Sequence, residues 1–129
     1  MEDRYLFKAK TARIVDSFNN AEDGKWVKGY LKCDTGKWEI SQFEYDRADY
    51  VWYEVDPFTI CQCTGLKDKN GKLIWENDIV DIQHYAAKAH KVKWGYGGFY
   101  VGINGLLCHY NTVCEVIGNI FDNQELLEK

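Results

Sequence analysis

Residues 64–80, TGLKDKNGKLIWENDIV, are the stretch that decides the fold of this chain. A polar turn over residues 68–71 ends in an Asn-Gly pair, which is favoured where a hairpin needs positive φ at both central positions. Three apolar residues follow, and a second polar break over residues 76–78 leads into a strand that begins at Ile79. The stretch predicts a tight hairpin and a further strand, and it contains no obvious catalytic group.

Short strand-like segments lie on both sides of this stretch. Turn signals separate them about every ten residues, a spacing typical of a small barrel or sandwich. No long run has helical periodicity, so we predict a mainly β protein. We expect strands near residues 4–10, 25–32, 38–43, 50–55, 58–63, 80–83, 91–94, 98–101, 106–110 and 114–120.

Several residues predict details of this pattern. Gly29 weakens its strand and suggests a bulge, and the turn signal at residues 34–36 predicts a hairpin between the strands on either side. Pro57 has no N–H for a ladder and should end the strand before it. Residues 122–127 have the pattern of a capped helical turn, with Asp122 as the cap. The segment 84–90 fits one helical turn or a loop.

Composition places the chain in a broad class. Its 129 residues fit one domain, and 46% hydrophobic and 16% aromatic content argues against disorder. No apolar run approaches the roughly 18 residues of a membrane span. The first residues have no basic leader followed by an apolar segment, so we expect a cytosolic protein and no membrane partner. The odd number of cysteines, five, predicts reduced thiols and not a disulfide framework.

Charge is mild overall and unevenly distributed. The net charge is −4, and the only basic zone is residues 64–114, with six basic and four acidic side chains. This excess is too weak to predict nucleic-acid binding by itself.

The central stretch closely resembles the signature of the YopX family, small proteins typical of phages and prophages. The similarity extends to its lead-in and to both ends of the chain, over residues 7–10, 24–31, 54–62, 98–101 and 115–123. Three positions depart from the family pattern. Cys63 replaces an expected Tyr, Asn77 replaces a Gly, and Phe58 replaces an acidic residue. Asparagine tolerates positive φ, so Asn77 is compatible with the turn.

The resemblance implies a single YopX-like domain. It implies an N-terminal β region with a hairpin over residues 1–57 and a small SH3-like β-barrel over residues 58–129. The family has no established activity, so the resemblance supplies no mechanism, and fold alone would be weak support for one.

Metal and catalytic sites find little support in the residue spacing. The candidate ligands do not have regular zinc spacing, and cysteine is often buried as a small apolar residue, so we expect no metal or cofactor. They are Cys61, Cys63, His84, His90, Cys108, His109 and Cys114. The carboxylates of Glu76, Asp78 and Asp81 border a turn, where such groups commonly accept backbone N–H groups. A nucleophilic pair of Cys108 or Cys114 with His109 has only sequence proximity behind it, so an enzyme is a remote alternative.

Nucleic-acid binding is one of two binding roles that the sequence leaves open. Lysines beside aromatic side chains can hold phosphates while the rings stack on bases. The candidate residues are Lys67, Lys69, Lys72, Lys91, Lys93 and Trp94, with Lys88, Tyr96 and Tyr100 nearby. This hypothesis predicts one contiguous lysine patch and salt-dependent binding.

Protein binding is the role that we favour. Five Trp and nine Tyr exceed the needs of a small core, and both residue types are favoured at interfaces. We expect a non-catalytic assembly module that forms a homo-oligomer or binds a host or phage protein. This hypothesis predicts that the aromatic residues outside the core gather on one face.

Overall fold

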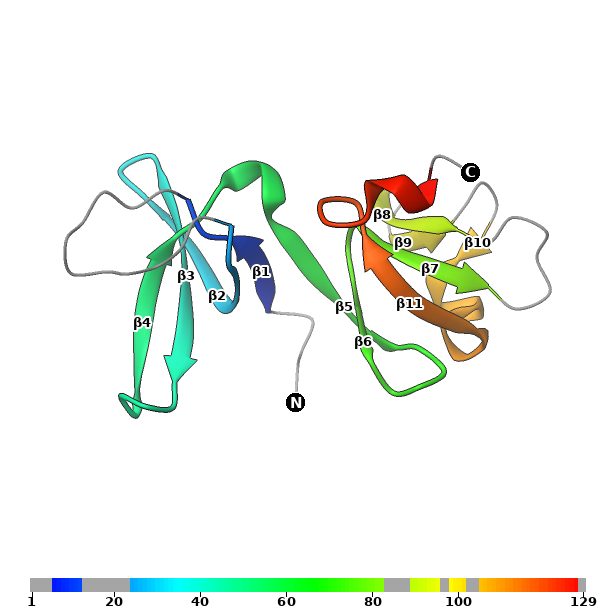
Figure 1. The fold of residues 1–129 in the computed structure, drawn as a ribbon, viewed down its shortest axis with the longest axis horizontal. Coiled ribbons are helices and arrows are strands. Elements are labelled where there is room, and N and C mark those ends of the chain that lie inside the picture. The colour runs from blue at the N-terminus through cyan, green and yellow to red at the C-terminus, as the bar shows by residue number, and fades with distance from the viewer. Residues whose placement is uncertain (1–5, 13–23, 83–88, 96–97, 102–104, 128–129) are drawn as a thin grey trace. The chain divides into compact units, whose positions relative to one another are not determined.

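The computed structural model describes residues 6–12, 24–82, 89–95, 98–101 and 105–127. The predicted mainly β class is confirmed, because the described residues form antiparallel strands joined by turns and short 3-10 helices (Figure 1). The strands are β1 (Phe7–Lys10), β2 (Trp26–Asp34), β3 (Lys37–Glu44), β4 (Asp49–Glu54), β5 (Cys61–Lys67), β6 (Leu73–Trp75), β7 (Asp78–Ile82), β8 (His90–Gly95), β9 (Gly98–Val101), β10 (Gly105–Leu106) and β11 (Cys114–Asn119). The 3-10 helices are η2 (Pro57–Thr59), η3 (Leu107–His109), η4 (Asn111–Val113) and η5 (Gln124–Leu127).

The strands belong to two sheets and the chain to two compact units. Hydrogen bonds order one sheet β4-β3-β2-β1-β5-β6 and the other β10-β9-β8-β7-β11. The N-terminal unit is Met1–Gln62 and the C-terminal unit is Cys63–Lys129. Strand β5 contributes to both, because Cys61 and Gln62 pair with β1 and the residues from Cys63 onward pair with β6.

The N-terminal unit is built on the hairpin of β2 and β3. Its turn is the predicted one, and both central residues have positive φ, 51° at Thr35 and 80° at Gly36, as a two-residue hairpin loop requires. Its buried core is Ala9, Val27, Ile40 and Val55.

Gly29 has a different role from the bulge that we predicted. Strand β2 pairs with β1 up to Gly29 and with β3 from Tyr30 onward, and neither register is interrupted there. A Cβ atom at residue 29 would lie 1.8 Å from the backbone oxygen of Ser41. Glycine is required because β3 approaches too closely for any side chain.

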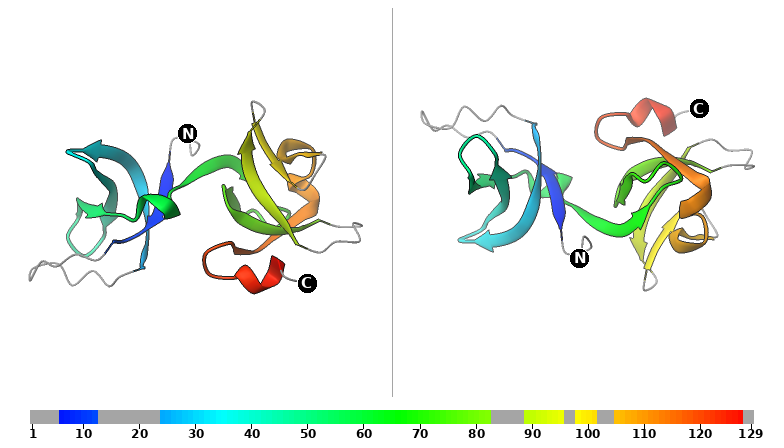
Figure 2. Two further views of the ribbon diagram at one scale, coloured as in Figure 1. Left: turned by 90° about the horizontal axis from the view of Figure 1, so that it is seen from above. Right: turned by 90° about the horizontal axis from the view of Figure 1, so that it is seen from below.

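The C-terminal unit contains the five-stranded antiparallel sheet, with β7 between β8 and β11 (Figures 1 and 2), as well as β6 and most of β5. Its core is Ile74, Val80, Ile82, Val92, Val101, Leu107 and Cys114. Strand β11 contains a bulge between Val116 and Gly118. The pairing of the described strands does not close this sheet on itself, and the SH3-like barrel stays a prediction.

Three other expectations concern the domain organisation, the segment 84–90 and the C-terminal helical turn. The single-domain organisation stays a prediction, and the segment 84–90 lies largely outside the described residues. At the C-terminal end the structure has one 3-10 turn, Gln124–Leu127, and the helical turn capped by Asp122 stays a prediction. No helix among the described residues is long and apolar enough to cross a membrane.

Candidate functional site

The turn of the central hairpin is held by one buried carboxylate, Asp68. Its Oδ1 accepts the backbone N–H groups of Asn70 and Lys72, both at 2.9 Å, and its Oδ2 accepts that of Val116 on β11, also at 2.9 Å. Gly71 alone in this turn has positive φ, 81°, so the prediction of positive φ at both Asn70 and Gly71 was wrong. The hydrogen bonds to the Asp68 carboxylate close this turn, in place of a backbone with two left-handed residues.

These contacts leave Asp68 ionised. Burial by itself would raise the pKa of the carboxyl. The hydrogen bonds from the N–H groups of Val116, Lys72 and Asn70 lower it, and the pKa of Asp68 therefore lies below its ordinary value. The backbone adds a second tie, because the N–H of Lys69 donates to the carbonyl oxygen of Cys114 at 2.9 Å. Asp68 therefore fastens the hairpin to β11 and has a structural role that the sequence did not predict.

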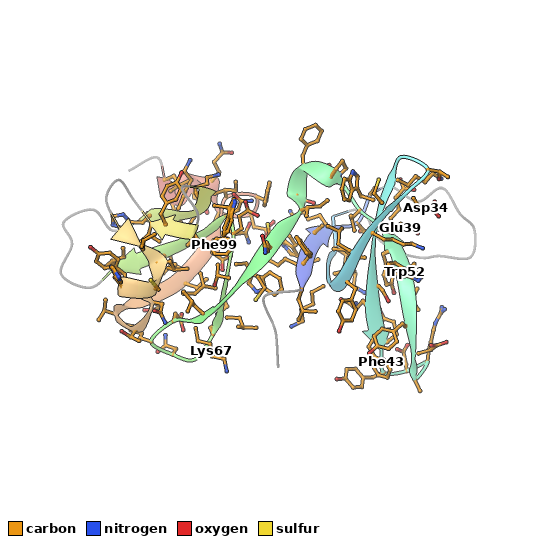
Figure 3. All side chains as sticks on the ribbon, turned by 180° about the vertical axis from the view of Figure 1, so that it is seen from behind. Asp34, Glu39, Phe43, Trp52, Lys67 and Phe99 are labelled. Carbon is orange, nitrogen blue, oxygen red and sulfur yellow. The ribbon has the colours of Figure 1, made fainter. Side chains whose placement is uncertain are left out.

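The three lysines of this hairpin are exposed but are not equally available. The Nζ of Lys69 lies 3.6 Å from Oε2 of Glu115 on β11. Lys67 and Lys72 are at the two ends of the turn, and Lys67 is labelled in Figure 3. A surface ion pair of this kind is weak, but it reduces the positive charge that the hairpin offers to a phosphate.

Lys91, Lys93 and Trp94 lie on β8, and they do not share a face. Successive side chains of a strand point to opposite sides, so Trp94 lies on the side opposite the two lysines. Trp94 packs edge-on against Phe99 with ring centroids 4.8 Å apart. The Nζ of Lys93 donates to Oδ1 of Asn77 at 3.0 Å. The ring that shares a face with Lys93 is Tyr100, its direct partner on β9, while the ammonium group of Lys93 is bonded to Asn77.

Of the candidate acid–base residues, Asp78 holds a backbone group and Asp81 faces another carboxylate. Asp78 is buried and its Oδ2 accepts the N–H of Trp75 at 2.8 Å. Asp81 lies directly opposite Glu115 in the pairing of β7 with β11. Asn77 closes the turn before β7 with φ of 71°, which confirms that asparagine can replace glycine there.

The cysteines divide into buried and exposed thiols. Cys61, Cys63 and Cys114 are buried, and Cys33 and Cys108 are exposed. Burial, with a smaller contribution from Asp68, raises the pKa of the Cys114 thiol to about 11, which makes it a poor nucleophile. Within the described residues, no three His, Cys, Asp or Glu side chains are grouped so that they could hold a metal ion. His84 lies outside those residues.

A more prominent feature is a group of exposed aromatic side chains, which the protein-binding hypothesis expects on one face but whose residues the sequence did not identify. One side of the sheet formed by β2, β3 and β4, together with the turn after β3, carries five exposed aromatic side chains, which we call the aromatic face. They are between 38% and 89% exposed and comprise Tyr30, Phe43, Tyr45, Tyr50 and Trp52. Figure 3 labels Phe43 on β3 and Trp52 on β4.

The pairing register brings these side chains together. Ser41 on β3 lies directly between Tyr30 on β2 and Trp52 on β4, and Phe43 lies opposite Tyr50. The Phe43 ring contacts Tyr50 edge-on at a centroid distance of 5.2 Å. Ser41 is only 6% exposed, because it lies between larger side chains. The aromatic face is therefore continuous across three strands.

Charged side chains flank the aromatic face at one end. The Nζ of Lys32 lies 4.1 Å from the centroid of the Trp52 ring and 4.0 Å from Oε1 of Glu39. Lys37 approaches Oε1 of Glu54 at 3.8 Å. The Trp52 ring thus already accepts a cation, which is the interaction that an exposed indole offers to a Lys or Arg side chain.

On the opposite side of β3 and β4, Tyr53, Gln42 and Glu44 form a hydrogen-bond network. Tyr53 Oη donates to Oε1 of Glu44 at 2.7 Å, and Nε2 of Gln42 donates to the same oxygen at 2.9 Å. The Tyr53 hydrogen bond is the largest cause of a lowered pKa at Glu44, with Gln42 next. Burial, followed by the bond to Glu44, raises the pKa of Tyr53 to about 12. This network fixes the two strands that carry most of the aromatic face.

The comparisons with known proteins concern the whole chain. No curated protein matches the sequence. The crystal structure of protein EF1440 from Enterococcus faecalis is similar at 26% identity over 95% of this chain and 96% of that chain, with a TM-score of 0.47. The family described as "YopX protein" matches residues 15–128, nearly the full length. The chain therefore belongs to the YopX family.

Proposed function

We propose that this YopX-family chain is a non-catalytic module of phage or prophage type that binds another protein through its aromatic face in the cytoplasm of a bacterial host. The observation that carries the proposal is the continuous group of exposed rings on β2, β3 and β4. Tyr and Trp are enriched in the centres of protein interfaces, where they bury a large area with few rotatable bonds.

The size of the aromatic face supports this role. With side chains of roughly 200 Å² each, the exposed fractions correspond to about 500 Å² of aromatic surface. A standard interface buries about 800 Å² on each partner. The face therefore offers more than half of the required area. A patch of this size is comparable to the largest apolar patch of a typical monomer, which is often functional.

Nucleic-acid binding through Lys67, Lys69, Lys72, Lys91, Lys93 and Trp94 is the competing proposal. The ion pair of Lys69 with Glu115 and the hydrogen bond of Lys93 to Asn77 weaken it. Self-association of the chain is a further prediction, which a mass measurement tests separately.

The SH3-like barrel is proposed for the C-terminal unit. In a barrel of that kind the last of five antiparallel strands returns beside the first, and β11 lies beside β7 after the meander β7-β8-β9-β10. Two 3-10 turns, η3 and η4, precede this last strand. The proposal includes the division of one YopX-like domain into residues 1–57 and 58–129.

The test is capture of partners from host lysate by the tagged chain, with and without nuclease. We expect one protein to be enriched regardless of nuclease, and the double variant Tyr50→Ser/Trp52→Ser to reduce its capture about tenfold or more. The matched control is Trp94→Ser, which removes a 54% exposed ring from the other unit. Circular dichroism checks that all variants fold.

Capture that disappears with nuclease would favour the lysine hypothesis. Capture that survives Tyr50→Ser/Trp52→Ser would remove the aromatic face as the binding surface. Light scattering of the purified chain separates self-association from both outcomes.

A further inference from the structure

Strand β4 has an open edge next to the aromatic face. It is the last strand in the order β4-β3-β2-β1. Residues that continue β1 meet its outer side at one end, where Thr11 bridges Val55 and the N–H of Ala12 donates to the Glu54 oxygen. Among the described residues, no strand pairs with the outer side at Tyr50 and Trp52. The N–H of Val55, just beyond β4, donates to the Trp38 oxygen at 2.9 Å. Because antiparallel strands alternate between hydrogen-bonded and non-hydrogen-bonded pairs, the backbone groups of Tyr50, Trp52 and Glu54 point away from β3.

Two contacts agree with this assignment. The N–H of Tyr50 donates to Oδ1 of Asp49 at 2.8 Å instead of joining the ladder, and the oxygen of Glu54 accepts the N–H of Ala12 at 3.0 Å. The N–H and C=O of Trp52 lie between these points. Trp52 therefore combines outward backbone groups with a ring on the aromatic face.

The edge lacks the usual protection against pairing. Natural edge strands are blunted by lysine, proline or a bulge. The sequence of β4, DYVWYE, contains neither lysine nor proline, and its register with β3 is uninterrupted over six residue pairs. Its aromatic and β-branched residues favour an extended strand. Such an edge can accept one more strand through backbone hydrogen bonds.

Charge decides which kind of strand it accepts. From Glu44 to Glu54 the chain carries four carboxylates, Glu44, Asp46, Asp49 and Glu54, and a single cation, Arg47. Pairing β4 with β4 of a second copy would bring two strands without any cation together, each with Asp49 and Glu54 at its ends, and like charges across a pair are destabilising. Phosphates would be repelled by the same carboxylates.

We propose that the open edge of β4 binds an extended, lysine- or arginine-bearing segment of the partner protein, which adds to the sheet as a further strand. This inference rests on the proposed function and names the chemistry of the partner. Alternate side chains of the added strand lie beside Trp52 and Tyr50. The Trp52 ring already contacts Lys32 and Glu54 already contacts Lys37, so the incoming cations meet the Tyr50 ring and the Asp49 carboxylate.

The test uses defined peptides of about eight residues, the length of an ordinary strand. One alternates Lys with Val or Thr, and its partner has Glu in place of every Lys. Titration of the ¹⁵N-labelled full-length chain by NMR detects binding even at millimolar affinity. We expect the Lys peptide to shift the amide signals of Tyr50, Trp52 and Glu54 and the Glu peptide to leave them unchanged.

Charge reversal supplies the second arm. Asp49→Lys should lower the affinity for the Lys peptide about tenfold, because one attraction becomes one repulsion. The same variant should bind the Glu peptide. Asp34→Lys is the matched control, since it reverses an exposed carboxylate at the far end of β2 and should leave the affinity unchanged.

Equal binding of the two peptides, or shifts confined to other strands, would overturn the proposal, and so would failure of the Lys peptide to shift any β4 amide. Self-association that Asp49→Lys strengthens, because it removes like charges at the strand ends, would assign the edge to a second copy. If capture of the partner protein depends on Tyr50 and Trp52 but not on Asp49, the aromatic face remains the binding surface. Only the proposal that a basic strand adds to β4 is then refuted.

Discussion

Replacing Asp68 should unfasten the central hairpin from β11. In Asp68→Ala, three backbone N–H groups lose their acceptor, and two of them belong to the turn while the third belongs to Val116. Hydrogen bonds to a charged group contribute about 1.5–3 kcal/mol each, and bonds that share one acceptor are not additive. We therefore expect the free energy of unfolding to fall by about 3–5 kcal/mol, a large part of the stability of a small domain.

Asp68→Asn tests the two oxygens of this carboxylate separately. The amide oxygen can keep the N–H groups of Asn70 and Lys72, while the amide nitrogen then faces the N–H of Val116, so that two donors meet. The loss should be about 1–3 kcal/mol. Urea unfolding followed by tryptophan fluorescence measures both variants, and hydrogen exchange of the Val116 amide should accelerate in each. Asp34→Ala, at an exposed turn, is the control and should stay within about 0.5 kcal/mol of the parent.

Acid should weaken the same contact. The pKa of Asp68 is lower in the folded chain than in the unfolded one, so its contribution is present above the unfolded value of about 3.9 and is lost as pH falls toward the folded value. Asp68→Asn should flatten that part of the pH dependence. An Asp68→Ala variant as stable as the control, or unchanged exchange at Val116, would refute the role of this carboxylate.

Three further perturbations test other parts of the fold. Gly29→Ala should cost about 2–4 kcal/mol in urea unfolding, because its Cβ would lie 1.8 Å from the Ser41 oxygen, and wild-type stability would mean that β3 can move away. Tyr53→Phe should raise the pKa of Glu44 in an NMR titration, since the phenol is the largest cause of its lowering, and an unmoved titration would contradict that cause. Iodoacetamide should alkylate the folded chain at two exposed thiols and spare the buried ones, as mass spectrometry would show: it should modify Cys33 and Cys108 but not Cys61, Cys63 or Cys114.

The sequence predicted the features that depend on neighbouring residues. The hairpin turn at Thr35 and Gly36 and the tolerance of Asn77 for positive φ are local properties of the backbone, and both are found. The role of Asp68 depends on Val116, which is 48 positions away along the chain. An aspartate two positions before an Asn-Gly pair looks like an ordinary turn residue until that distant contact is known.

The aromatic face could not be predicted for a related reason. Val51 and Tyr53 alternate with Tyr50 and Trp52 on β4, and all four side chains are apolar or aromatic. Such a strand has no polar side to mark the solvent, so the pattern does not tell which set faces the core. Pairing with β3 decides it, because Tyr53 lies opposite the buried Ile40.

The nucleic-acid hypothesis stays a prediction, and its pairing of Lys93 with Trp94 depends on proximity along the chain. Lys93 and Trp94 are adjacent in sequence, and adjacent residues of a strand point to opposite faces. A ring and a cation on one face come from alternate positions of a strand or from other strands of the sheet, as Lys32 of β2 and Trp52 of β4 do across β3 at 4.1 Å and as Lys93 and Tyr100 do on β8 and β9. The same geometry favours the N-terminal unit as the place of binding. There the rings remain exposed beside an open strand edge, whereas Lys69 and Lys93 in the C-terminal unit already contact Glu115 and Asn77.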